Sequence, residues 1–184
     1  MMVKNVGKLV AALAIAAVSV ATTAQAQRGT QNTNTRDGLW ISGGLGYGSL
    51  GCDGCGSREG AISGNFAIGG TISPRFLLGV GTAGWTKSEQ DARLTVAEID
   101  ARIRFYPQTR GNFFLTGGIG AGSVTGSFGT LSNTETGFGA IVGMGYDIRV
   151  TRNYSVTPYW NAYGMKNDNT DANVGQVGIA VTWH

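Results

Sequence analysis

The sequence of 184 residues has a single histidine, His184, and only two cysteines, Cys52 and Cys55. A serine nucleophile needs a neighbouring base to take its proton, and the only histidine that could do so is the last residue of the chain. Two thiols alone make an incomplete zinc site, because four ligands are usual. We therefore expect no catalytic residues, no metal and no cofactor.

Basic clusters and long apolar runs are also scarce. The chain has 14 Lys and Arg against 11 Asp and Glu, and no block of them forms the basic patch that nucleic-acid binding requires. The longest apolar run, LVAALAIAAVSVA, is shorter than the roughly 20 residues of a membrane-spanning helix. The sequence therefore predicts neither a nucleic-acid partner nor a transmembrane helix.

The apolar run near the N-terminus has the flanks of a secretory signal. Lys4 and Lys8 precede it, and the tripeptide AQA at positions 24–26 follows it. This order is typical of a signal peptide with its cleavage site. We predict a signal peptide over residues 1–26 and a short polar tail over 27–37; a retained N-terminal anchor is the alternative.

Glycine is abundant, with 31 residues, and many glycines lie inside segments in which apolar and small residues alternate. Alternation with a period of two predicts strands with one apolar face. Glycines would weaken the strands of a soluble sandwich, whereas the crowded lumen of a narrow barrel needs small residues. The predicted strands are Leu39–Leu50, Gly60–Ile72, Arg75–Thr86, Leu94–Tyr106, Asn112–Thr125, Thr136–Val150, Tyr154–Met165 and Asn173–Trp183.

The connections between these strands alternate in predicted length. We expect short turns at 73–74, 107–111 and 151–153, and longer polar loops at 51–59, 87–93, 126–135 and 166–172. Outer-membrane barrels have short periplasmic turns and longer outer loops. An even number of strands then places both termini, and the polar tail, in the periplasm.

The pleat of a strand assigns its residues to the lumen or to lipid, because residues two apart share a face. In the strand 94–106 the apolar residues from Ala97 to Phe105 would meet lipid, and the strand 136–150 repeats the pattern. Charges in a narrow lumen need partners, so a salt-bridged plug is expected, with an occasionally open gate for small ions as the alternative. The lumen polar cluster consists of Glu98, Asp100, Arg102, Arg104, Asp147 and Arg149.

Aromatic residues gather near both ends of the predicted strands, as they do at the two interfaces of a membrane. Some of them have the phase of the lumen and are expected at the mouths of the barrel. These are Trp40, Trp85, Tyr106, Phe114 and Tyr163.

A signal segment, eight alternating strands, alternating connections and a terminal aromatic residue resemble the small OmpA-like, OmpX-like and opacity-type outer-membrane barrels. The resemblance implies an all-β, eight-stranded antiparallel up-and-down transmembrane β-barrel over residues 38–184, in the outer membrane of a Gram-negative bacterium. Its partners would be outer-membrane lipid, lipopolysaccharide and the barrel assembly machinery, and it would be a monomer. The family's C-terminal assembly signal corresponds to Val177, Ile179, Val181 and Trp183, with His184 added after the aromatic residue.

Two short motifs have competing interpretations. The sequence CDGC places Cys52 and Cys55 in the first outer loop, where an exported protein would form a disulfide; a redox role would need groups that stabilise a thiolate. Gly79, Gly81 and Gly84 match the dinucleotide-binding pattern GxGxxG, but no further βαβ units follow.

Three functions stay open at this point. The first is a non-enzymatic surface barrel that contributes to envelope integrity or surface interaction. The second is a small, low-conductance pore with a charged, gated lumen. The third is a lipid-modifying outer-membrane enzyme, for which the chain lacks a suitable histidine. A soluble, lipocalin-like barrel is a structural alternative, but it would carry polar residues on its outer face.

Overall fold

The structure is a computed structural model that describes residues 36–52, 56–168 and 171–184. The predicted signal peptide over 1–26 lies outside the described residues, and so does nearly all of the polar tail over 27–37. Both stay predictions. Among the residues described, no helix is long and apolar enough to cross a membrane.

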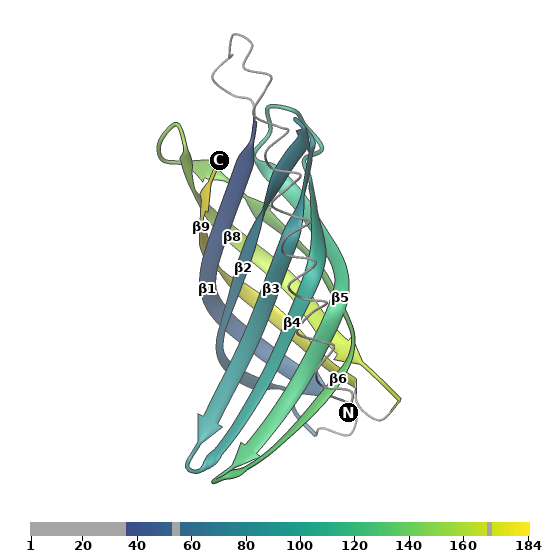
Figure 1. Ribbon diagram of the computed structural model, residues 1–184. Coiled ribbons are helices and arrows are strands. Elements are labelled where there is room, and N and C mark those ends of the chain that lie inside the picture. The colour runs from purple at the N-terminus through teal and green to yellow at the C-terminus, as the bar shows by residue number, and fades with distance from the viewer. Residues whose placement is uncertain (1–35, 53–55, 169–170) are drawn as a thin grey trace.

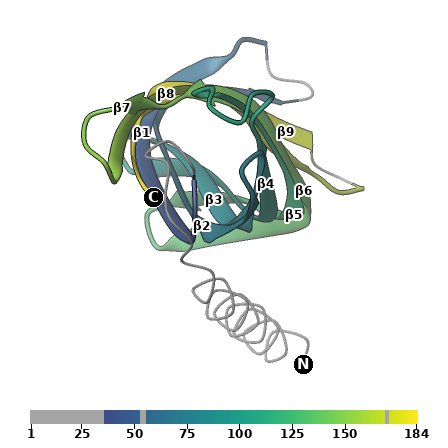
Figure 2. The same cartoon turned by 90° about the horizontal axis from the view of Figure 1, so that it is seen from above.

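One antiparallel sheet closes on itself to form a barrel (Figures 1 and 2). Its closure comes from the pairing of β1 with β9 and of β6 with β8. The short β7 continues β6 beyond Asp147 and also pairs with β8, so the barrel has eight walls and the predicted fold class is confirmed. The strands are β1 (Leu39–Cys52), β2 (Glu59–Ser73), β3 (Phe76–Glu89), β4 (Ala92–Phe105), β5 (Phe113–Phe128), β6 (Leu131–Tyr146), β7 (Ile148–Arg149), β8 (Tyr154–Lys166) and β9 (Asp171–Trp183).

The predicted alternation of short and long connections is wrong at two of the outer loops. The segments 87–93 and 126–135 are mostly strand, and only the turns 90–91 and 129–130 interrupt the pairing. Both segments are polar on one face and only partly apolar on the other, which makes them look like loops in the sequence. The connection 106–112, predicted to be short, is longer than either hairpin turn.

Side chains alternate between the lumen and the outer surface along each long strand. On β4, Ile99 is 49% exposed whereas its neighbours Glu98 and Asp100 are buried. On β9, Val177, Ile179 and Val181 are all more than half exposed. The predicted outward phases are therefore confirmed as an apolar surface for lipid, while the role of Val177, Ile179, Val181 and Trp183 as an assembly signal stays a prediction.

Outward-facing aromatic residues encircle the end of the barrel where the chain enters and leaves the sheet. Phe76 and Phe105 stack there with ring centroids 4.9 Å apart. Tyr47 and Phe138, each 60% exposed, lie nearer the opposite end. Such belts suit the two interfaces of a membrane. The residues of the first belt are Phe76, Phe105, Phe113, Tyr146, Tyr154 and Trp183.

Two apolar clusters fill the lumen near its ends. Trp40, Tyr106 and Phe114 pack with Ala67 and Leu77 near the end where β1 begins and β9 ends. The cluster nearer the hairpin end contains Leu50, Ala83, Trp85, Val96, Ile141, Tyr163, Ala172 and Val174. All five inward-phase aromatic residues named from the sequence are at most 2% exposed. They close the lumen above and below its charged middle.

Candidate functional site

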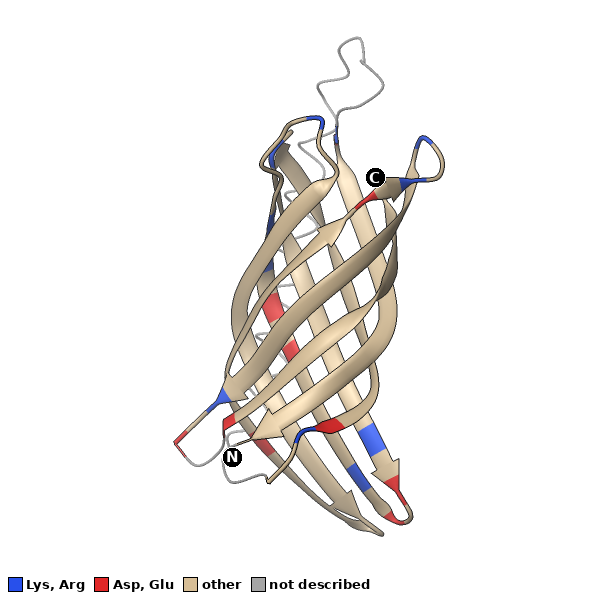
Figure 3. Ribbon diagram, turned by 180° about the vertical axis from the view of Figure 1, so that it is seen from behind, with Lys and Arg blue, Asp and Glu red and all other residues tan. Residues whose placement is uncertain are grey.

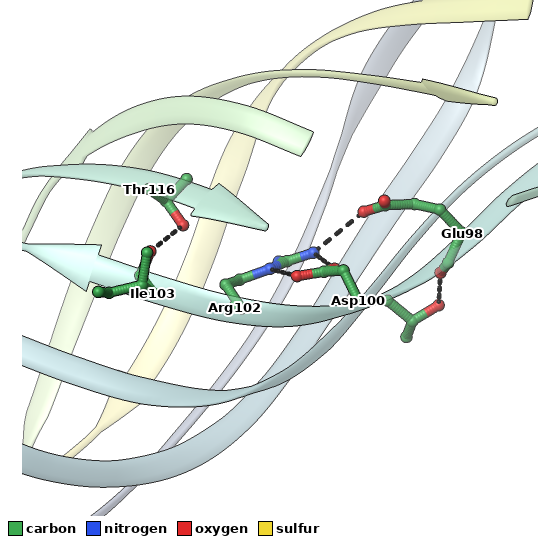
Figure 4. Close-up of polar contacts among 6 residues, drawn as sticks. Glu98, Asp100, Arg102, Ile103 and Thr116 are labelled. Atoms are coloured by element: carbon green, nitrogen blue, oxygen red, sulfur yellow. Dashed lines mark hydrogen bonds and ion pairs between the residues drawn. The ribbon is translucent and has the colours of Figure 1, made fainter. Parts of the chain in front are cut away.

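Three charged side chains from alternate positions of β4 meet in the middle of the lumen. Arg102 donates from Nε to Oδ1 of Asp100 at 3.0 Å, and from Nη2 to the second carboxylate oxygen. The same Nη2 reaches Oε1 of Glu98 at 3.2 Å (Figure 4). All three residues are at most 3% exposed. One guanidinium therefore holds two carboxylates that have lost contact with water, an arrangement that depends on every partner being present.

Glycines on the two neighbouring strands make room for this charged group. A Cβ atom at Gly81 of β3 would overlap the guanidinium of Arg102. A Cβ atom at Gly118 of β5 would overlap the carboxylate of Asp100. At these two positions the glycine is required by close approach, and this accounts for part of the unusual glycine content of the strands.

A second polar group surrounds Asp147, at the end of the lumen where β1 begins and β9 ends. Its carboxylate accepts hydrogen bonds from Tyr106 at 2.8 Å and from Thr157 at 2.7 Å. Nε2 of His184 lies 3.7 Å from the same carboxylate. The strand is interrupted at this residue, since β6 ends just before Asp147 and β7 begins just after it. The group thus joins the last residue of the chain to the opposite wall.

Two arginines near Asp147 lie over aromatic rings, and Arg36 also donates to the backbone carbonyl oxygens of Thr109 and Gly111. The guanidinium of Arg104 lies 4.4 Å from the ring centre of Trp40 and 4.8 Å from that of Phe114. Arg36 lies 3.4 Å above the ring of Tyr106. A cation over an aromatic face keeps a favourable contact where water is excluded. These contacts with the rings offset part of the free-energy cost of burying arginine at this end of the barrel.

Five of the six residues predicted as one lumen cluster are distributed over two groups. Glu98, Asp100 and Arg102 form the first, and Asp147 belongs to the second, in which its charge acts on Arg104. Arg149 is half-buried on β7, and no hydrogen bond or ion pair within the described residues joins it to either group. The group around Asp147 also contains residues that no sequence pattern assigned to it, namely Arg36, Tyr106, Thr157 and His184. Only the inward phase of Tyr106 signalled its place in advance.

Little space remains among the charged side chains. The lumen cavity has a volume of about 10 Å³, which is enough for roughly one water molecule. Its lining includes Arg102 and Arg104 together with Asn65, Tyr159 and Asn161. Charged residues otherwise gather at the two ends of the barrel, as Figure 3 shows.

The outer hairpins form a second candidate site. The β3–β4 and β5–β6 hairpins are the lowest points of the barrel in Figure 1. A groove of about 630 Å³ lies on their inner side, lined by Glu59, Lys87, Glu89, Leu94, Phe128 and Leu131 among others. Phe128 and Leu131 are 67% and 76% exposed. The groove therefore combines apolar side chains with a cluster of charges.

Lys87 is the centre of that charge cluster. Its ammonium group lies 2.5 Å from a carboxylate oxygen of Glu59 and 2.6 Å from one of Glu89. These hydrogen bonds, first to Glu59 and then to Glu89, raise the pKa of Lys87 above its ordinary value. Lys87 is thus a fixed cation across the physiological pH range, linking β2 to the end of β3.

The remaining sequence-predicted chemistry concerns cysteine and metal ligands. Cys52, the last residue of β1, is disulfide-bonded, whereas Cys55 lies outside the described residues, so its pairing with Cys52 stays a prediction. Across 36–52, 56–168 and 171–184, no three His, Cys, Asp or Glu side chains gather as a metal ion would need.

Comparisons with known proteins bear on the whole barrel. The sequence model of the family described as outer membrane protein beta-barrel domain matches residues 10–184. The structure is similar to Ail, the attachment invasion locus protein of Yersinia pestis, at 15% identity and a TM-score of 0.57, over 79% of this chain and 97% of Ail. Neisserial surface protein A is similar at 13% identity and a TM-score of 0.59, over 79% of this chain and 96% of that one. No curated protein matches the sequence.

Removing the central cation should destabilise the barrel. We expect Arg102→Ala to lower the free energy of unfolding by about 3–5 kcal/mol, because two carboxylates stay buried without their partner. Urea unfolding in phospholipid vesicles, followed by tryptophan fluorescence, measures this change. Adding Glu98→Gln and Asp100→Asn should recover part of the loss. An unfolding free energy for Arg102→Ala equal to that of the wild type would contradict the assigned role.

A matched pair of glycine substitutions tests the close approach at Gly81. We expect Gly81→Val to lower the free energy of unfolding by about 1–3 kcal/mol, since the added atoms overlap Arg102. Gly70→Val on the adjacent strand is the control, because a Cβ there meets nothing within 4 Å, and we expect a change within about 0.5 kcal/mol. Equal effects in the same urea assay would show that contact with Arg102 is irrelevant.

Proposed function

The chain belongs to the outer membrane protein β-barrel domain family, and we propose that it is a non-enzymatic surface barrel that docks other proteins. The docking part is its projecting sheet, which is formed by the β3–β4 and β5–β6 hairpins. In this proposal the two hairpins point away from the cell and both chain termini lie in the periplasm. The single observation that carries the function is a sheet edge at the outer end of β6, residues 131–134, which pairs with β5 alone among the described residues.

The edge arises because β6 is longer than its partner on one side. Residues Leu131 to Tyr146 of β6 pair with β5, but pairing with β8 starts only at Phe138. Asn167 donates to the carbonyl oxygen of Thr136 at 3.2 Å and covers the start of the gap. Among the described residues, the segment 131–134 therefore pairs on one side only, with β5. Unpaired backbone groups of this kind readily accept a further strand.

The groove beside the edge supplies the second element that strand docking needs. A bound strand points alternate side chains to one face, and Phe128 and Leu131 lie on the inner face of the projecting sheet as exposed apolar contacts. Lys87 with Glu59 and Glu89 provides charges at the far side of the same groove. Backbone pairing would give affinity, and the groove would select the sequence.

The filled lumen favours this function over a pore. Apolar clusters lie near both ends, and the charged group between them leaves a cavity of about 10 Å³. A rigid, closed barrel suits a support that holds the projecting sheet above the membrane. Its contribution to envelope integrity would follow from the same closed, lipid-facing wall.

Cysteine labelling tests the proposed orientation. In a Cys52→Ser, Cys55→Ser background, Ser127→Cys on the β5–β6 hairpin should react with a membrane-impermeant maleimide in intact cells. Thr151→Cys, in the turn at the opposite end, should react only after the outer membrane is permeabilised. The reverse pattern would overturn the orientation.

Peptide binding tests the docking edge. A fluorescent ten-residue peptide of alternating Val and Thr should bind the wild-type barrel in detergent, because it can extend β6 by strand pairing. A variant in which residues 125–134 are replaced by Asn-Gly should lose at least about tenfold in affinity, since the edge residues 131–134 are removed. Replacing only residues 90–91 by Asn-Gly is the control and should leave binding unchanged. Unaltered binding to the shortened variant would refute the proposal.

A further inference from the structure

The lumen contains a buried guanidinium group that no carboxylate contacts directly. Arg104 on β4 is 5% exposed, and its Nε and Nη1 atoms have no hydrogen-bond partner among the described residues. The charge of Asp147 acts on it from beyond ion-pair distance, and that carboxylate already accepts from Tyr106 and Thr157. A buried, charged donor without an acceptor is costly. Arg104 therefore has the capacity to bind a further, negatively charged group.

The aromatic contacts of Arg104 do not replace such a group. Its guanidinium carbon lies 4.4 Å from the ring centre of Trp40 and 4.8 Å from that of Phe114. A ring face attracts the charge of a cation, but it accepts a hydrogen bond only weakly. The N–H groups at Nε and Nη1 still need an acceptor of full strength.

The small lumen cavity lies beside this guanidinium group. Its volume is about 10 Å³, and Arg102 and Arg104 both line it. Asn65, Tyr159 and Asn161 add amide and hydroxyl donors to the lining. No carboxylate is among the lining residues in the part of the chain that the structure describes. Two cations, neutral donors and no acid favour an anion in this cavity over a cation.

The distribution of charge in the lumen points the same way. In the central group, the carboxylates of Glu98 and Asp100 both bind Arg102, and neither lines the cavity. The group around Asp147 has two buried guanidinium groups, those of Arg36 and Arg104, for its one carboxylate. One negative charge beside Arg104 would balance this second group.

We propose that the cavity beside Arg104 binds a single halide ion, with chloride as the ordinary occupant. The volume admits one occupant of about the size of a water molecule, and this excludes phosphate, sulfate and carboxylate ligands. Arg104 donates to the ion from Nε and Nη1, and the ion gives the buried guanidinium its missing negative partner. A water molecule fits the same volume but brings no charge. The inference is independent of the docking function proposed above.

The apolar clusters at both ends of the lumen enclose this site. Trp40 and Phe114 belong to the cluster on one side, and Trp85 and Tyr163 belong to the cluster on the other. An ion in the middle is therefore bound when the barrel folds, and it exchanges slowly with solvent afterwards. The salt present during refolding decides whether the site is filled.

X-ray diffraction at long wavelength tests the site in the wild-type protein, because chloride scatters anomalously there and water does not. Barrel refolded in sodium chloride should show one anomalous peak in the lumen, within hydrogen-bond distance of Nε and Nη1 of Arg104. Barrel refolded and crystallised in sodium gluconate is the control and should lack the peak. Chloride peaks confined to the protein surface, or no peak at all, would overturn the proposal and identify water as the occupant.

The stability of the barrel provides a second test, by urea unfolding in phospholipid vesicles at equal ionic strength in chloride and in gluconate. The folded-to-unfolded ratio of the wild type should rise by about tenfold at a chloride concentration of about ten times the Kd. Arg104→Met keeps an apolar stem and should abolish this rise. Arg152→Met removes an exposed arginine from the turn at the same end, so it is matched in charge and should keep the rise.

Equal stability of the wild type in the two salts would contradict the proposal. A rise that Arg104→Met retains would contradict it as well, since chloride would then act elsewhere on the protein. If Arg104→Met does not fold, the diffraction experiment and the salt dependence of the wild type still decide the question.

Discussion

The barrel depends on one constraint: in hydrocarbon, each backbone N–H and C=O must find a partner within the protein. A sheet meets this requirement only by closing, and closure here comes from β1 with β9 and β6 with β8. An eight-stranded barrel has an interior just wide enough for side chains. The packing of the lumen follows from that width. Large aromatic rings fill it near both ends. The ion-paired side chains in the middle fit only because Gly81 and Gly118 lack side chains.

The strands and their facing could be predicted from the sequence because closure between lipid and a packed lumen enforces a strict period of two. Glu98, Ile99 and Asp100 have the predicted alternation, and the inward aromatic residues are buried. The hairpin segments 87–93 and 126–135 could not be predicted in the same way. Above the membrane neither face is uniformly apolar, so the alternation loses its hydropathy signal while the pairing continues.

The contacts between side chains in the lumen could not be predicted from the sequence either. Arg104 stacks on Trp40 and Phe114, and His184 approaches Asp147. Such contacts join strands that are far apart in the chain, and they depend on the stagger of the barrel, which no local pattern records. The inward phase predicts which residues face the lumen, but the register between strands decides which of them come into contact.

The same constraint also explains where the proposed docking edge can form. Within the lipid band β6 must have neighbours on both sides, and from Phe138 onward it does. Beyond the band water can satisfy the backbone groups of a sheet edge, so residues 131–134 of β6 can extend with β5 as their only paired strand among the described residues. The sheet thereby gains two faces and an edge that lipid would not permit. Sequence variation there does not disturb closure, and interaction can evolve at the hairpins while the barrel below stays fixed.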